Sequence, residues 1–148
     1  MQEQLKLENQ LCFRLYTASR LITQAYHPQL SGIGLTYPQY LVIMVLWEKD
    51  GQPVNDIARK LFLETNTVTP LLKRMEAEGF ISRTKGQADA RQVIVRLTSK
   101  GRALEKEAEC IPYEVGKAVA CRSITPESAP ALYETLDDLI QTLSVGGR

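Results

Sequence analysis

The chain has 148 residues, enough for one domain with a hydrophobic core, and its 18 basic residues nearly balance 17 acidic ones. No stretch is apolar enough to span a membrane, and the first residues lack a signal peptide's basic start and apolar run, so we expect a cytoplasmic protein without a membrane partner. Three widely spaced cysteines and one histidine predict neither a metal site nor a cofactor.

Residues 4 to 26 are predicted to form a long helix, which ends at His27-Pro28 because the residue before a proline avoids the helical region. Apolar residues recur along it at alternating spacings of four and three. Such a seam faces either the protein core or a second subunit, and the sequence leaves both interpretations open. Its members are Leu11, Leu15, Ala18, Ile22 and Ala25.

Cys12 lies in this helix, with Tyr16 four residues later on the same face. A single cysteine on an amphipathic helix is usually a small buried hydrophobe. A reactive role would require the thiolate, which hydrogen bonds from phenolic hydroxyls would stabilise. Other tyrosines are near in sequence, but spacing does not show whether they meet Cys12; they are Tyr26, Tyr37 and Tyr40.

Residues 37 to 40 open the next predicted helix, and residues 41 to 47 are apolar nearly all round, which places this helix at the centre of the core; a turn follows over residues 48 to 53. Two shorter helices are then predicted over residues 54 to 61 and about 65 to 78. Each has an apolar stripe at helical spacing. The stripes are Val54, Ile57, Ala58 and Leu61 in the first, and Val68, Leu71, Leu72 and Met75 in the second.

The opposite face of the second helix is polar, with two cations and no acid. It carries Asn66, Thr69, Pro70, Lys73 and Arg74. Pro70 places the helix start close by, and Gly79 occupies the position that glycine prefers after a helix end. Three residues are candidate N-caps: Thr65, Asn66 and Thr67.

A basic hairpin follows, with strands over residues 80 to 84 and 92 to 97 and a polar loop over 85 to 91. Helix, turn, helix and hairpin form the layout of a winged helix-turn-helix, whose second helix enters the DNA major groove. Other small α+β domains share these elements. However, residues 54–97 carry eight basic against five acidic residues, which favours a polyanionic partner.

Three helices are predicted in the last part of the chain. The first runs from Thr98 to about Glu109, and the second from Tyr113 to Arg122, with Cys121 included. The third starts after Thr125, its N-cap, with Pro126 at the first helical position. Ile111-Pro112 interrupts the run, and the glycines of residues 146 to 148 predict a frayed tail. The final helix has an apolar stripe, and together with the first helix it would make a dimerisation region. The stripe comprises Leu132, Leu136, Leu139, Ile140 and Leu143.

Several stretches resemble the MarR-type winged-helix repressors, and within them the organic-hydroperoxide sensor branch, OhrR. Leu71-Leu72-Lys73-Arg74-Met75-Glu76 is one of these stretches, and Asp89-Ala90-Arg91 in the hairpin is typical of MarR proteins generally. Leu11-Cys12-Phe13 and Thr36-Tyr37-Pro38-Gln39-Tyr40 are more specific to the peroxide-sensing branch. The match is good over about residues 5 to 112 and loose afterwards.

The resemblance implies that organic hydroperoxides oxidise Cys12 to a sulfenic acid and that tyrosines hydrogen-bond its thiolate. The matching tyrosines are Tyr16, Tyr26 and Tyr37, the last two contributed by the partner subunit. It also implies that Asp89 fixes the wing and Arg91 reaches the minor groove. Some family members resolve the oxidised cysteine with a later one; Cys121 is the favoured candidate, with Cys110 or an external thiol as alternatives.

The sequence thus predicts a mainly α fold with a small β-hairpin wing, forming one domain over residues 1–148. Residues 54–97 would be the DNA-binding lobe, and residues 4–27 and 110–145 the dimerisation helices. The expected function is a homodimeric repressor, not an enzyme, that binds a pseudo-palindromic double-stranded operator and releases it on organic hydroperoxide. Alternatives are release by a small aromatic ligand, or a thiol-dependent peroxidase. The candidate DNA-binding residues are Thr65, Asn66, Thr67, Thr69, Pro70, Lys73, Arg74, Arg83, Lys85, Asp89 and Arg91.

Overall fold

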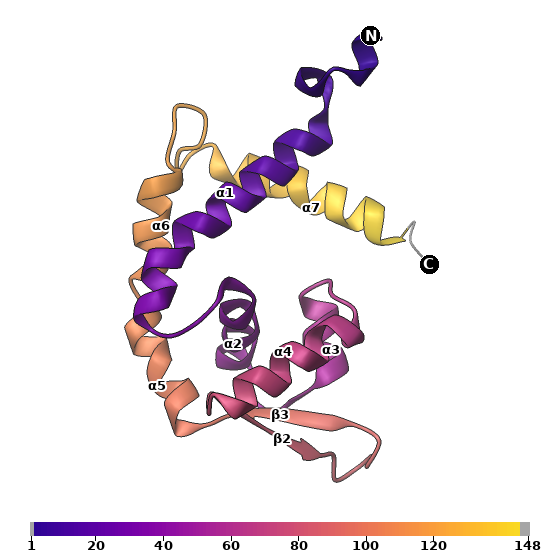
Figure 1. Ribbon diagram of the computed structural model, residues 1–148, viewed down its shortest axis with the longest axis vertical. Coiled ribbons are helices and arrows are strands. Elements are labelled where there is room, and N and C mark those ends of the chain that lie inside the picture. Colours follow the sequence, from indigo (N-terminus) through magenta and orange to yellow (C-terminus); the bar gives the residue numbers. More distant parts are fainter. Residues whose placement is uncertain (1, 146–148) are drawn as a thin grey trace.

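A computed structural model describes residues 2–145 and shows two layers of helices joined by α5, with a small sheet at one end (Figure 1). The expected mainly α fold with a hairpin is confirmed. In chain order the elements are η1 (Glu3–Leu5), η2 (Leu7–Asn9), α1 (Leu11–Gly32), α2 (Tyr37–Glu48), β1 (Gln52–Pro53), α3 (Val54–Lys60), α4 (Thr65–Ala77), β2 (Ile81–Lys85), β3 (Val93–Leu97), α5 (Ser99–Ala108), α6 (Ile111–Val119) and α7 (Ala129–Val145).

The first helix differs from the prediction at both ends. Before Leu11 the chain forms two short 3-10 turns, because the side chains of Asn9 and Gln10 donate to the carbonyls of residues 3 and 4 and so compete with helix formation. At the other end α1 continues through Pro28 to Gly32. The last turn places Leu30 fully in the core, and that burial offsets the hydrogen bond that the proline removes.

Helix α2 is the centre of the core, as its composition predicted. Thr36 and Gln39 form a reciprocal capping box that starts the helix. Behind this cap most of α2 is buried, and it packs against α3, α4 and β3. The buried apolar side chains of α2 are Tyr40, Val42, Ile43, Val45 and Leu46.

The sheet has three antiparallel strands in the order β1-β3-β2. The hairpin register pairs Arg83 with Val95 and Ile81 with Leu97. Strand β1 falls where the sequence predicted only a turn, because two residues ending in a proline give no strand pattern; Pro53 is tolerated there because β1 is an edge strand.

The start of α5 approaches the end of α4 so closely that only glycine fits at Gly101. A Cβ atom there would lie 2.2 Å from the carbonyl oxygen of Phe80 and 3.2 Å from Cδ2 of Leu97. The carbonyl of Gly101 also accepts a 3.0 Å hydrogen bond from the indole nitrogen of Trp47 in α2. Gly101 therefore fixes α5 against both α2 and the base of the hairpin.

Gly101→Ala is expected to destabilise the protein by about 3 kcal/mol, because the clash is with backbone that cannot turn away. Urea unfolding at fixed protein concentration measures the loss. Gly32→Ala is the matched control: it lies at the end of α1 with nothing within 4 Å of its would-be Cβ, and we expect no loss. Equal unfolding midpoints for the two variants would contradict this role of Gly101.

The C-terminal elements start and end at other residues than predicted. Helix α6 ends at Val119, so Cys121 lies outside it, in a turn where it bridges to Ile124. Helix α7 begins at Ala129 rather than Pro126; residues 126 to 128 form a turn, in which the side chains of Thr125 and Ser128 accept hydrogen bonds from each other's backbone amides. The break at Ile111-Pro112 is confirmed, and the tail of residues 146 to 148 lies outside the described residues.

Helices α1, α6 and α7 lie at the end opposite to the hairpin (Figure 1). Many of their large apolar side chains are exposed in the single chain. These include Leu11, Phe13, Tyr16, Leu21, Ile22, Tyr113, Leu132, Tyr133, Ile140 and Leu143. Within residues 2–145 no single helix is long and apolar enough to cross a membrane. Helices α1 and α2 reach the necessary length and apolar composition only when taken together, and the angle between them is 72°.

Candidate nucleic-acid interface and thiol site

Helix α4 presents a polar face to solvent. Its apolar stripe is buried as predicted at Val68, Leu72 and Met75. The opposite side chains are therefore turned outward: Asn66, Thr67, Pro70, Lys73 and Arg74 are exposed, and Thr69 is half-buried. This face offers amide, hydroxyl and cationic groups without an acid, which suits base edges and phosphates.

The start of α4 differs from the prediction. The N-cap is Glu64, not Thr65, Asn66 or Thr67, and its side chain makes no capping hydrogen bond. The hydroxyl of Thr65 instead contacts Oδ1 of Asn55 in α3 at 3.2 Å. Pro70 is consequently the sixth helical residue, beyond the first turn. The threonines at the helix start are thus not needed as caps and remain on the surface.

A groove of about 470 Å³ separates α4 from the hairpin and contains candidates from both. Thr65 and Thr69 line one side, and Arg83, Asp89 and Arg91 line the other. Asn55 and Gln92 also line it, and sequence reasoning missed both. Asn55 precedes the stripe residue Ile57 by two positions, so helical spacing could have placed it on the outer face of α3.

Arg83 forms an intramolecular ion pair with Glu76. Its guanidinium donates to Oε2 of Glu76 from Nε at 3.1 Å and from Nη2 at 2.9 Å, and its backbone amide donates to Oε1 at 2.9 Å. Its side chain is only 21% exposed. The pair joins α4 to β2, so Arg83 sets the angle of the hairpin relative to α4.

These hydrogen bonds from Arg83 hold the pKa of Glu76 below its usual value. Because the folded-state pKa is the lower one, the pair stabilises the fold above the ordinary carboxyl range, and this stabilisation is lost as the pH falls through the folded pKa. We therefore expect urea unfolding of Glu76→Gln to depend less steeply on pH than wild type below about pH 5. Glu107→Gln, an exposed residue of α5, is the control and should keep the wild-type slope.

The wing tip is organised by Asp89. Its carboxylate accepts from the backbone amide of Arg91 at 3.0 Å, from Nε at 3.1 Å and from Nη2 at 3.3 Å. These contacts lower the pKa of Asp89. The side chain of Arg91 is 92% exposed, and Lys85 is exposed at the end of β2. The tip thus carries two cations in solvent.

Three tyrosines gather where α1 meets α2. The ring centroid of Tyr26 lies 4.9 Å from that of Tyr37 and 5.9 Å from that of Tyr40, and Tyr40 also packs edge-on against Trp47 at 6.3 Å. Burial raises the pKa of Tyr26, Tyr37 and Tyr40, and neighbouring phenols add to the effect on Tyr26. These hydroxyls therefore remain protonated hydrogen-bond donors at neutral pH.

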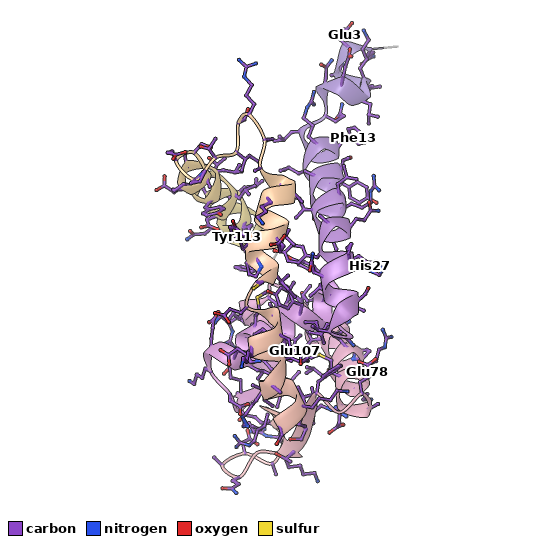
Figure 2. The ribbon with its side chains drawn as sticks, turned by 90° about the vertical axis from the view of Figure 1, so that its left-hand side faces the viewer. Glu3, Phe13, His27, Glu78, Glu107 and Tyr113 are labelled. Atoms are coloured by element: carbon purple, nitrogen blue, oxygen red, sulfur yellow. The ribbon has the colours of Figure 1, made fainter. Side chains whose placement is uncertain are left out.

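Cys12 is exposed at the other end of α1, fourteen residues before Tyr26, and a helix of that length separates them by about 21 Å. Figure 2 shows their neighbours Phe13 and His27 at well-separated places along α1. Tyr16, one turn from Cys12, is 68% exposed. Within one chain the structure therefore brings Tyr26 and Tyr37 together but brings neither to Cys12.

The two later cysteines are also exposed, Cys110 just before α6 and Cys121 in the turn after it. Neither is paired in the structure. Within the described part of the chain, no group of three or more His, Cys, Asp or Glu side chains could hold a metal ion.

The fold and the polar face of α4 define a winged helix-turn-helix protein of the DNA-binding class. A family profile described as "Transcriptional regulator SarA/Rot" matches residues 24–108. The organic hydroperoxide resistance transcriptional regulator of Bacillus subtilis is 40% identical over 141 residues, 95% of this chain and 94% of that protein. TtmR of Methylorubrum extorquens is 48% identical over 110 residues. The aligned region covers 74% of this chain but only 56% of TtmR.

Solved structures agree with the sequence comparison. Reduced AbfR bound to DNA matches with a TM-score of 0.75 and 38% identity, covering 96% of this chain and 98% of AbfR. AbfR, from Staphylococcus epidermidis, has also been solved with a disulfide formed. This chain belongs to the SarA/Rot and MarR-type family of winged-helix transcriptional regulators.

Proposed function

We propose that this protein is a homodimeric repressor that releases its operator when an organic hydroperoxide oxidises Cys12. The observation that carries the proposal is the separation of Cys12 from the phenols at Tyr26 and Tyr37. Three protonated phenols form a donor cluster at one end of α1, while the thiol lies exposed at the other end. An antiparallel second copy would bring the thiol of one chain to the phenols of the other.

A dimer is further supported by the exposed apolar side chains of α1, α6 and α7. A single soluble chain rarely leaves so many large apolar side chains in water along adjacent helices. We assign residues 4–27 and 110–145 to the interface and residues 54–97 to the DNA-binding lobe, within one domain of residues 1–148. Two copies of α4 related by a two-fold axis would read a pseudo-palindromic site, one half-site each.

The chemistry of the signal follows from a thiolate and a peroxide. The thiolate of Cys12 attacks the terminal oxygen of the hydroperoxide; a sulfur–oxygen bond forms, the oxygen–oxygen bond breaks, and the organic part leaves as an alcohol after taking up a proton. A second thiolate then attacks the sulfenic sulfur; a disulfide bond forms, the sulfur–oxygen bond breaks, and the hydroxide leaves as water after taking up a proton. Cys121 is our preferred second thiol because it lies in an exposed turn; Cys110 or a small external thiol are the alternatives.

A second candidate signal is a small aromatic ligand. A groove of about 720 Å³ lies between α2 and α5, and Tyr40, Met44 and Trp47 give it an apolar, aromatic wall. Its volume suits a ligand of drug size or smaller. In that case Cys12 would be passive, and the dimer would respond to the ligand without oxidation.

The test is an operator-binding titration of the purified protein before and after one equivalent of cumene hydroperoxide, repeated with dithiothreitol. Loss of binding on oxidation and recovery with the reductant supports the proposal. Binding that peroxide leaves unchanged would exclude it and favour the ligand-released repressor. Steady consumption of peroxide with a thiol reductant, rather than a single stoichiometric oxidation, would instead indicate a peroxidase.

A further inference from the structure

Gln39 is the one buried polar side chain among the described residues, at 2% exposure. It is the third residue of α2 and lies two positions after Tyr37 and one before Tyr40. A buried amide costs free energy unless all its groups are hydrogen-bonded. The contacts of Gln39 therefore indicate what its burial achieves.

Both ends of the Gln39 amide are used. Its Oε1 accepts from the backbone amide of Thr36 at 2.9 Å, which closes the capping box of α2. Its Nε2 donates to Oε2 of Glu78 at 2.7 Å, across 39 residues of sequence. The hydrogen bond to Thr36 belongs to the N-terminal cap of α2. The hydrogen bond to Glu78 has no part in that cap and instead links α2 to the end of α4.

Glu78 is the C-cap of α4, the helix that carries the polar DNA-facing surface. Tyr37, Gln39 and Glu78 also line one cavity of about 430 Å³, together with His27 at the end of α1. Figure 2 shows Glu78 on the same side of the molecule as His27 and below it. The hydrogen bond therefore joins the start of the helix that holds the phenols to the end of the helix that would enter DNA.

We propose that Gln39 is a positioning residue that couples the tyrosine cluster to α4 through its hydrogen bond to Glu78. The inference rests on the proposed function and extends it with a route from signal to DNA. A shift of Tyr37 when Cys12 is oxidised moves the first turn of α2, and Gln39 passes that shift to the C-terminal end of α4. The carbonyl of Glu78 also accepts a 2.8 Å hydrogen bond from Lys100, so without Gln39 the end of α4 keeps its link to α5 but loses this hydrogen bond to α2.

The test separates the link from the cap. In Gln39→Glu the introduced carboxylate still accepts from Thr36 and keeps the capping box, but it faces the carboxylate of Glu78 and cannot donate to it. In the double variant Gln39→Glu with Glu78→Gln, the hydrogen bond is restored with donor and acceptor exchanged. Glu78→Gln alone also keeps an acceptor for Gln39 and should behave like wild type.

Each variant is titrated with operator DNA in the reduced state and after one equivalent of cumene hydroperoxide. We expect Gln39→Glu to bind operator about tenfold more weakly when reduced, and to lose most of the further weakening that oxidation causes in wild type. The double variant should return both values to within about twofold of wild type. Labelling of the sulfenic acid should show that Cys12 oxidises at the wild-type rate in all three variants.

Wild-type operator affinities for Gln39→Glu would overturn the coupling, and so would a double variant that stays weak. If peroxide leaves the operator affinity of the wild-type protein unchanged, the proposed sensing function is excluded. The reduced-state affinities still decide whether Gln39 positions α4, because they need no oxidation. Thermal unfolding of each variant distinguishes a lost link from a lost fold, since a folded variant keeps a cooperative transition.

Discussion

Cys12→Ser is expected to bind operator as tightly as the reduced wild-type protein and to show no release after organic hydroperoxide. Serine replaces the sulfur with an oxygen that hydroperoxides do not oxidise, while its size and exposed position leave the start of α1 unchanged. In the wild-type protein we expect oxidation to weaken operator binding by about tenfold or more. The measurement is the ratio of operator Kd values with and without one equivalent of cumene hydroperoxide.

Cys110→Ser and Cys121→Ser are the matched controls, because both thiols are exposed and neither is assigned the sensing role. Either variant should still form the sulfenic acid at Cys12, whichever thiol resolves it. A Cys12→Ser protein that still releases DNA on peroxide would show that another residue senses the oxidant. Release by both single controls would point to a small external thiol as the resolving partner.

The double substitution Lys73→Ala with Arg74→Ala is expected to weaken binding by about a hundredfold for each half-site that the dimer contacts, at roughly 1.4 kcal/mol per lost contact. Both cations are exposed on the outer face of α4, where the surrounding side chains leave them available to DNA. If both contact phosphates in each subunit, the plot of log affinity against log salt concentration should also become shallower by about four for the dimer. Fluorescence anisotropy over a series of salt concentrations measures both quantities.

Arg122→Ala is the control for charge alone. Arg122 is exposed in the turn between α6 and α7, at the end of the molecule opposite to the hairpin (Figure 1). Removing it changes the net charge without touching the face of α4, so operator affinity should stay within about twofold of wild type. A salt slope that falls as much for Arg122→Ala as for one α4 cation would argue against α4 as the DNA-binding element.

The amino-acid sequence by itself determined the identity and order of the main elements. The apolar spacing in α4 is a local pattern, and it was read with the correct face inward. The break at Ile111-Pro112 is also a short-range signal. For the same reason the wrong boundaries lie where a local rule met a competing interaction, as at Pro28, where burial of Leu30 carries the helix onward.

Only the tertiary structure decided which distant side chains meet. The sequence could not show that Arg83 pairs with Glu76 or that Gln39 donates a hydrogen bond to Glu78. Nor could it show that Gly101 lies against the carbonyl of Phe80. It also left open whether the tyrosines surround Cys12; the length of α1 shows that those of the same chain, apart from Tyr16, do not. The physical reason is range: periodicity and capping depend on neighbours within one or two helical turns, whereas these contacts depend on how whole elements pack.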